Sequence, residues 1–207
     1  MNRFFFAPAS LALAATLAFS FCGTARAEVQ TFEIDHAHSS VTFKIRHLLS
    51  TVPGKFKSFK GTIKIDPDKR DSVQVDATID TASIDTDETK RDDHLRSPDF
   101  FDAARFPTIK FTGNKLTDVN ADHTKAKLEG MLTMRDVTKP IVLDVQWLGM
   151  ATDPMKNLKA AGTATASLNR KDFGIVWNKT MDNGGLLVGD DVSIEINVEA
   201  QIPKPVQ

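Results

Sequence analysis

The sequence predicts an all-β fold in which eight antiparallel strands form a barrel or a sandwich. Apolar and polar residues alternate with a period of two along most of the chain, which is typical of strands with one buried and one solvated face. Turn signals such as Asp66-Pro67-Asp68, Lys139-Pro140 and Asn183-Gly184-Gly185 separate these runs. The composition, with 41% hydrophobic and 26% charged residues among 207, is that of a globular chain and excludes a disordered one.

The expected strands follow one another along the chain. In the first run Val41, Phe43 and Ile45 alternate with polar residues, and in the last run Val192 and Ile194 do the same. The eight runs cover residues 40–48, 54–65, 72–80, 107–115, 124–134, 140–149, 158–169 and 190–201. Many short strands of this kind predict a closed or two-layered sheet.

One stretch between the third and fourth strands breaks the alternation. Residues 87–95 are acidic first and basic later, which suits the dipole of a short helix. Ser97-Pro98-Asp99 ends this helix, and residues 100–105 add another turn before Phe106-Pro107. We therefore expect a short helical insertion at this point of the barrel or sandwich.

Residues 1–27 are expected to form an export signal rather than a part of the fold. Arg3 supplies the positive start, residues 4–21 are almost wholly apolar, and Ala25-Arg26-Ala27 fits the rule for cleavage after a small residue. The alternative is a retained membrane anchor. A lipid attached at Cys22 is disfavoured because Phe21 stands where that processing needs a small residue. The expected mature domain covers residues 28–207 and acts in the periplasm.

Charge and cysteine content exclude several classes of function. The formal net charge is −1, so the chain lacks the basic excess of a nucleic-acid-binding protein. A single cysteine excludes an intrachain disulfide framework and any Cys-rich zinc module.

The strand expected at 158–169 carries small residues on its inward face. These are Ala160, Gly162, Ala164 and Ala166, followed by Leu168. An eight-stranded barrel is just wide enough either to fill with side chains or to hold one small ligand. Small inward residues favour the ligand cavity, and a flattened, fully packed barrel is the alternative.

Several motifs stand in order between residues 32 and 200. They are Asp35-His36-Ala37-His38-Ser39-Ser40-Val41, His47-Leu48, Val52-Pro53-Gly54-Lys55-Phe56, Ser83-Ile84-Asp85-Thr86, residues 91–102, Phe106-Pro107, residues 130–133, Val137-Thr138-Lys139-Pro140, Arg170-Lys171-Asp172-Phe173-Gly174, Trp177-Asn178 and residues 188–191. In this order they resemble the YceI family of bacterial lipid- or polyisoprenoid-binding proteins. The resemblance implies a lipocalin-like, eight-stranded antiparallel barrel that holds a long isoprenoid or acyl chain. One departure is that Gly162 stands where the family has an aromatic residue.

Two groups of side chains suggest other chemistry. His36 and His38 with His47 and His94 could hold a metal, but zinc needs three or four convergent ligands and the resemblance implies no metal, so capping and hydrogen-bonding roles are preferred. The charged residues Arg91 to Arg96 could be acid–base machinery. Without a nucleophile motif, we expect them to lock the helical insertion onto the barrel, with His94 or Arg96 meeting a polar head group as a second alternative.

The sequence therefore predicts a non-enzymatic periplasmic carrier of a polyisoprenoid, such as a quinone or prenyl phosphate, or of a fatty-acyl compound. No cofactor, metal or nucleic-acid partner is expected; transient membrane contact during ligand transfer is expected, and a homodimer is left open. The rivals are a lipid hydrolase or isomerase centred on His94 and a ligand-free, protein-binding barrel. The residues expected to contact the ligand are Phe43, His47, Phe56, His94, Arg96, Phe100, Phe106, Phe111, Trp147, Gly162, Ala164, Phe173 and Trp177.

Overall fold

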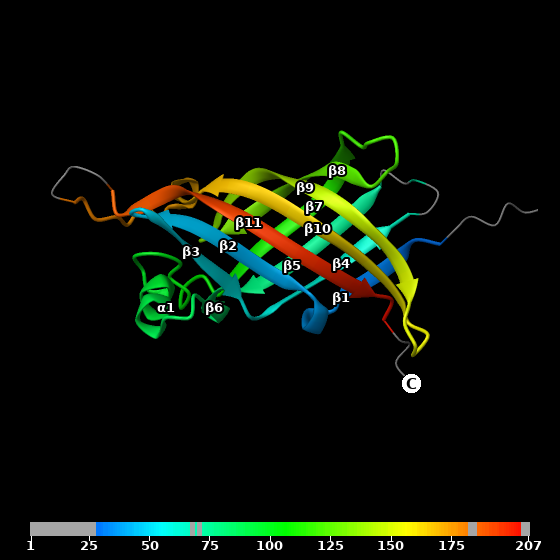
Figure 1. The fold of residues 1–207 in the computed structure, drawn as a ribbon, viewed down its shortest axis with the longest axis horizontal. Coiled ribbons are helices and arrows are strands. Elements are labelled where there is room, and N and C mark those ends of the chain that lie inside the picture. Colours follow the sequence, from blue (N-terminus) through cyan, green and yellow to red (C-terminus); the bar gives the residue numbers. More distant parts are fainter. Residues whose placement is uncertain (1–27, 67–68, 70–71, 182–185, 204–207) are drawn as a thin grey trace, which may run out of the picture.

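The strands close into an antiparallel barrel, shown in Figure 1. The structure is a computed structural model, and it describes residues 28–66, 69, 72–181 and 186–203. The expected export signal, and most of the turn signals at residues 66–68 and 183–185, lie outside these residues. The strand segments are β1 (Gln30–Ile34), β2 (Ser40–His47), β3 (Ser50–Phe56), β4 (Phe59–Ile65), β5 (Val73–Asp80), β6 (Ile84–Asp85), β7 (Thr108–Thr117), β8 (Lys125–Met134), β9 (Val137–Thr152), β10 (Leu158–Asn169) and β11 (Val188–Gln201).

Eight strands form the closed ring, in the order β1, β4, β5, β7, β8, β9, β10 and β11, and β11 pairs again with β1. The long strand β11 also pairs with β2, and β2 forms a hairpin with β3. Every pairing is antiparallel. The eight-stranded antiparallel barrel predicted from the sequence is therefore confirmed.

The structure adds two strands to the expected runs, β1 and the two-residue β6, and divides one run in two. β1 was not expected, because its five residues bury a single large apolar side chain, Phe32, and give too short a pattern. The run expected at 54–65 is two strands, β3 and β4, which pair with β2 and β1 respectively. Lys57 and Ser58 separate them.

The turn expected at Lys139-Pro140 is wrong. The turn between β8 and β9 is formed by Arg135 and Asp136, whose φ angles of 52° and 58° suit a tight hairpin turn. Pro140 lies within β9, opposite Met131 of β8. It is tolerated there because β10 pairs with β9 only from Asp144 onward, so this side of β9 has no neighbour that needs a backbone donor.

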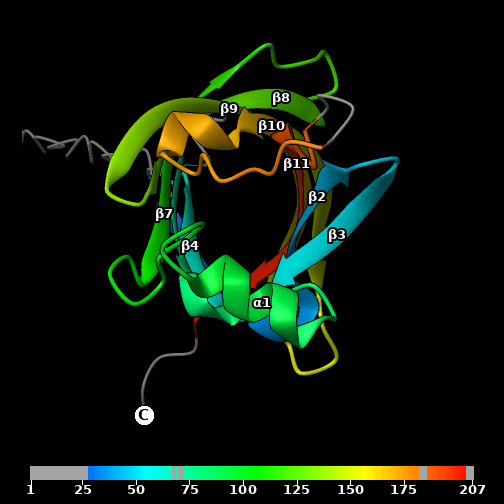
Figure 2. The ribbon, with the colours of Figure 1, turned by 90° about the vertical axis from the view of Figure 1, so that its left-hand side faces the viewer.

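The helical insertion lies between β5 and β7 and is the α-helix α1 (Thr89–Arg96), close to the predicted position. Short 3-10 turns stand at η1 (His36–His38), η2 (Thr81–Ser83) and η3 (Arg170–Phe173). Figure 2 looks along the barrel and shows α1 at the rim of one end. Among the described helices, none is long and apolar enough to cross a membrane.

The packed core is divided between two clusters. The larger cluster joins the insertion to the barrel and includes Phe56, Ile84, Phe100 and Phe173. The smaller cluster, Phe32 with Ala160 and Ala200, joins β1, β10 and β11. Much of the remaining inward surface of the barrel faces a cavity.

Candidate functional site: an apolar cavity inside the barrel

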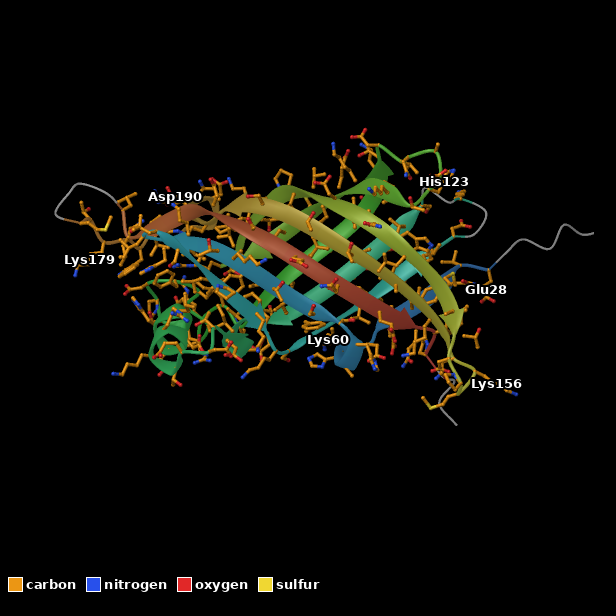
Figure 3. All side chains as sticks on the ribbon, in the orientation of Figure 1. Glu28, Lys60, His123, Lys156, Lys179 and Asp190 are labelled. Atoms are coloured by element: carbon orange, nitrogen blue, oxygen red, sulfur yellow. The ribbon has the colours of Figure 1, made fainter. Side chains whose placement is uncertain are left out.

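The barrel encloses a cavity of about 1200 Å³. The rows that the alternation predicted to point inward line it, including Val41, Phe43, Ile45 and His47 of β2. The lining reaches from His94 on α1 at one end to His123 at the other, and Figure 3 labels His123 at the end opposite Lys179. This extent favours the open barrel over the packed alternative.

Glycines in the wall let two phenylalanine rings lie close against it. Gly54 of β3 pairs with Phe43, and a Cβ placed on Gly54 would lie 2.3 Å from the Phe43 ring. The Phe111 ring covers Gly113 and Gly130 in the same way. These rings occupy the space where a side chain would stand on each glycine. The rings can therefore lie close to the strand backbone only because glycine has no Cβ.

The wall formed by β10 is lined by small residues, as the sequence predicted. Ala160, Gly162 and Ala164 face the cavity, and Leu168 follows. A Cβ on Gly162 would meet only the backbone of Gln146, with the carbonyl oxygen at 3.0 Å.

The alternation of β10 is not strict along its whole length. The pairing with β9 shifts between Ala161 and Gly162, and both Ala161 and Thr163, which were expected to point outward, also border the cavity. Ala166, expected to point inward, is absent from the lining. The extra residue of this shift is Leu148 of β9, so the parity of the lining residues changes along β9 between Trp147 and Met150, whereas β10 pairs with β11 without a shift.

An aromatic group stands at the end of the cavity near α1. The His94 ring lies edge-on to Phe100, with ring centroids 5.0 Å apart, and edge-on to Trp177, with centroids 4.9 Å apart. His94 Nε2 is 2.9 Å from a carboxylate oxygen of Asp99. Together these contacts join α1 to the segment that follows η3.

A buried arginine that sequence reasoning did not single out as a site residue holds that segment. Arg170 is 3% exposed and donates to the backbone carbonyls of Gly189, Ile175 and Trp177. Its Nη2 is also 3.2 Å from Asp190. Burial lowers the pKa of Arg170, an effect that Asp190 opposes. The arginine therefore fixes the position of Trp177 at the mouth.

The carboxylate of Asp190 forms ion pairs with two basic side chains of η3. It pairs with Arg170 and with Lys171, whose Nζ is 2.8 Å away. Lys171 is the main cause of the lowered pKa of Asp190.

The charged residues of the insertion lock it to the barrel, as expected from the sequence. Arg96 donates to the backbone carbonyls of Ala82 and Ile84 and pairs with Asp93 at 2.9 Å. All three contacts lie outside the cavity. Arg96 thus holds α1 against the barrel. It does not line the cavity, as a residue that contacts a ligand head group would.

Arg91 borders the cavity, where Arg96 was expected. Its Nε donates to the Thr86 hydroxyl and its Nη2 to the Thr86 carbonyl, both at 2.7 Å. The buried Asp92 accepts from the Thr86 amide, so it supports this arrangement instead of pairing with an arginine. Arg91, Lys90 and His94 all border the cavity.

The histidines do not gather as a four-ligand site. His47 and His94 line the cavity, whereas His36 Nε2 lies 2.6 Å from the carbonyl of Lys57. His38 instead meets Asp35 and Glu199, a carboxylate far away in the sequence.

The ammonium group of Lys159 already lies between the carboxylates of Asp35 and Glu199. Lys159 Nζ is 2.8 Å from Asp35 and 2.8 Å from Glu199. Hydrogen bonds from Lys159 and then from His38 hold the pKa of Asp35 at about 2, below its ordinary value of 3.8. The arrangement fastens η1 to β10 and β11, which is the hydrogen-bonding role preferred from the sequence.

Most residues predicted to contact a ligand line the cavity. They are Phe43, His47, Phe56, His94, Phe100, Phe111, Trp147, Gly162, Ala164 and Trp177. Arg96, Phe106 and Phe173 do not: Phe173 is buried in the larger core cluster, and Phe106 lies beneath the guanidinium of Arg105. These three residues lie in the helical insertion and in η3. The two-residue alternation of side chains along a strand does not predict side-chain directions there. Ligand contact itself stays a prediction.

Comparisons with known proteins agree with this architecture. A family model described as a YceI-like domain matches residues 32–200. A protein of Staphylococcus aureus strain MSSA476, UPF0312 protein SAS2572, is 34% identical over 173 residues, which is 83% of this chain and 97% of that protein.

Two solved structures are similar in fold. The YCEI protein of Campylobacter jejuni is 33% identical, with a TM-score of 0.64 over 77% of this chain and 90% of that chain. A polyisoprenoid binding domain from Saccharophagus degradans, implicated in plant cell wall breakdown, is 14% identical, with a TM-score of 0.59 over 85% of this chain and 100% of that chain.

Proposed function

Because the chain belongs to the family of proteins with a YceI-like domain, and because its barrel encloses an apolar cavity, we propose that it is a carrier that holds a long apolar chain. The ligand class is a polyisoprenoid, such as a quinone or prenyl phosphate, or a fatty-acyl compound. The solved polyisoprenoid binding domain of similar fold supports the isoprenoid as the first candidate.

The observation that carries this proposal is the cavity of about 1200 Å³ with inward rows of valine, isoleucine, leucine and phenylalanine. Each buried methylene contributes about 0.8 kcal/mol, so one five-carbon isoprene unit contributes up to about 4 kcal/mol before the costs of binding. A few units are then enough for firm retention. Specificity comes from the length of the cavity and from the polar groups at its ends.

The α1 end supplies polar groups suited to the head of such a ligand. Lys90, Arg91 and His94 border the cavity there, with Glu88 beside them in the lining and the Asp99 carboxylate 2.9 Å from His94. Arg91 is held in place by Thr86, so it is ordered before a ligand arrives. We place an anionic or strongly polar head at this end and the tail along the barrel.

Intrinsic fluorescence provides a direct test. The chain has two tryptophans and no tyrosine, and both Trp147 and Trp177 line the cavity, near opposite ends. Titration of delipidated protein with polyprenyl phosphate, quinone and fatty acid should change this emission saturably. Trp147→Phe and Trp177→Phe variants assign the signal to one end, and an emission that no lipid changes, together with no binding by equilibrium dialysis, would refute the carrier.

A catalytic role centred on His94 has less support. Within the described part of the chain, the one hydrogen bond of the His94 ring goes to Asp99, and its other neighbours are the rings of Phe100 and Trp177. No described hydroxyl therefore receives activation from this imidazole. Turnover of a lipid panel that disappears in His94→Ala would reverse this choice.

We further propose that residues 1–27 are removed on export and that the carrier acts in the periplasm, where it meets a membrane transiently to exchange its ligand. The apolar run that ends in Ala25-Arg26-Ala27 supports this. N-terminal sequencing of exported protein should begin at Glu28. An intact Met1 or a lipid-modified Cys22 would contradict it.

A further inference from the structure

The tip of the β2–β3 hairpin departs from the residue types that tight turns usually contain. His47 pairs with Ser50, so Leu48 and Leu49 form the turn between them. Leu48 has a φ of 52°, in the left-handed region that favours glycine or asparagine. Leu49 is 105% exposed, the largest value among the exposed large hydrophobic side chains of the described residues. A strained turn that presents leucine to solvent indicates a role outside folding.

The tip belongs to a larger apolar surface at the cavity mouth. The Leu48 amide donates to the carbonyl of Leu187 at 3.0 Å, and Leu187 itself borders the cavity. Leu186, which directly precedes Leu187, is 40% exposed. We call Leu48, Leu49 and Leu186 the apolar rim. Figure 2 shows the hairpin projecting from the barrel beside the α1 end, and Figure 3 places Lys179 at this end.

The strand that leads to the tip is basic. Residues 36–65 contain six Lys and Arg residues and no Asp or Glu, although the whole chain has a net charge of −1. Lys44 and Arg46 are exposed on the outer face of β2, below the tip.

Two acidic side chains of β11 oppose the charge of this face. Glu195 is 4.0 Å from Lys44 and offsets part of its charge, and Asp191 lies on the same strand, whereas Asp190 is held by Arg170 and Lys171. Exposed apolar side chains above a basic surface are typical of segments that enter the interface of an anionic membrane.

We propose that the apolar rim is a docking site for an anionic phospholipid bilayer. Leu48 and Leu49 enter the interface, and Lys44 and Arg46 bind the lipid head groups. The inference rests on the proposed carrier function, since it explains how an apolar ligand passes between bilayer and cavity without crossing water. His47, which precedes the tip and lines the cavity, marks the point where the docked surface meets the entrance.

The test is flotation of delipidated protein with vesicles of phosphatidylglycerol and phosphatidylcholine, compared with vesicles of phosphatidylcholine alone. Binding should be restricted to the anionic vesicles and should weaken with added salt. Leu49→Ser should weaken it about tenfold, because most of a leucine side chain no longer leaves water. Lys44→Gln combined with Arg46→Gln should weaken it about twenty-fivefold, at about fivefold for each charge.

Met155 provides the matched control, because it is 73% exposed in the turn at the opposite end of the barrel, next to the labelled Lys156 in Figure 3. Met155→Ser should bind vesicles like the parent. Leu48→Gly removes the strained leucine, so it should raise the melting temperature and still weaken vesicle binding. This variant separates docking from loss of fold.

Three outcomes would overturn the proposed docking site: no binding to vesicles, equal binding to neutral vesicles, and equal effects of Leu49→Ser and Met155→Ser on vesicle binding. So would light scattering that shows Leu49→Ser dissociating a dimer while vesicle binding persists, since the rim would then join two copies of the chain. Tryptophan titration with lipid in the same samples keeps the two proposals apart. Vesicle binding that needs Leu49 without ligand uptake refutes the carrier alone, and uptake without vesicle binding refutes the docking site alone.

Discussion

Replacement of Ala164 by leucine tests whether the small residues of β10 border open volume. Ala164 pairs with Val145 of β9 and Ile196 of β11 and faces the cavity. Leucine adds three carbon atoms, which at about 0.8 kcal/mol each displace up to about 2.4 kcal/mol of ligand burial, a loss of affinity of roughly fiftyfold. In an open cavity the same side chain gains contacts, so the free energy of unfolding without ligand should stay constant or rise by up to about 2 kcal/mol.

The assay combines lipid titration with thermal melts of the delipidated protein. Thr165→Leu is the control, because Thr165 is exposed and pairs with Asp144 and Glu195 on the outer face. It should leave binding unchanged. If Ala164→Leu instead lowers the free energy of unfolding by roughly 1–3 kcal/mol, the interior is already packed and the cavity argument fails. Binding lost only in Thr165→Leu would show that the inward face of β10 is misassigned.

Four further substitutions test other parts of the structure. Arg96→Ala should lower the free energy of unfolding by about 1–3 kcal/mol, measured by urea denaturation, because the carbonyls of Ala82 and Ile84 lose their donors. His94→Ala should instead lower the affinity for a ligand with an anionic head more than the affinity for a plain hydrocarbon. Equal losses of affinity in both variants would contradict this division of roles. Because the pKa of Asp35 is lowered to about 2, its ionised form contributes stability above about pH 4, and this stability is lost as the pH falls toward 2. Asp35→Asn should therefore flatten this part of the pH–stability profile by roughly 1–2 kcal/mol. An unchanged acid profile would argue against the ion pair with Lys159. Gly54→Ala should push the Phe43 ring into the cavity and weaken ligand binding, and unchanged affinity would show that the ring has room elsewhere.

The sequence predicts the barrel and most of its lining because side-chain direction in a strand depends only on parity. Val41, Phe43 and Ile45 therefore point inward together, whatever the distant strands do. The same rule fails where a strand is irregular. Along β9 the lining passes from Trp147 to Met150 because Leu148 is an extra residue between them, and Pro140 enters a strand because the neighbouring strand has ended.

Contacts between distant residues have no comparable local signal. Lys159 reaches Asp35 across 124 positions and Glu199 across 40, and only the closure of the barrel brings the three together. Arg170 binds backbone carbonyls, which every residue has, so no pattern of side chains reveals its partners. Likewise Arg91 and Arg96 lie in one charged motif, and the helix geometry decides which of them borders the cavity.

Mass spectrometry of an organic extract from the protein, purified without detergent from the cells that produce it naturally, tests the central claim most directly. The account predicts a single class of long apolar compound, isoprenoid or acyl, in near-stoichiometric amount, and a marked decrease of that compound in extracts of Ala164→Leu but not of Thr165→Leu. Extracts that contain no such compound, from protein that also takes up no polyprenyl or acyl lipid on titration, would contradict the assignment of this cavity as a carrier site.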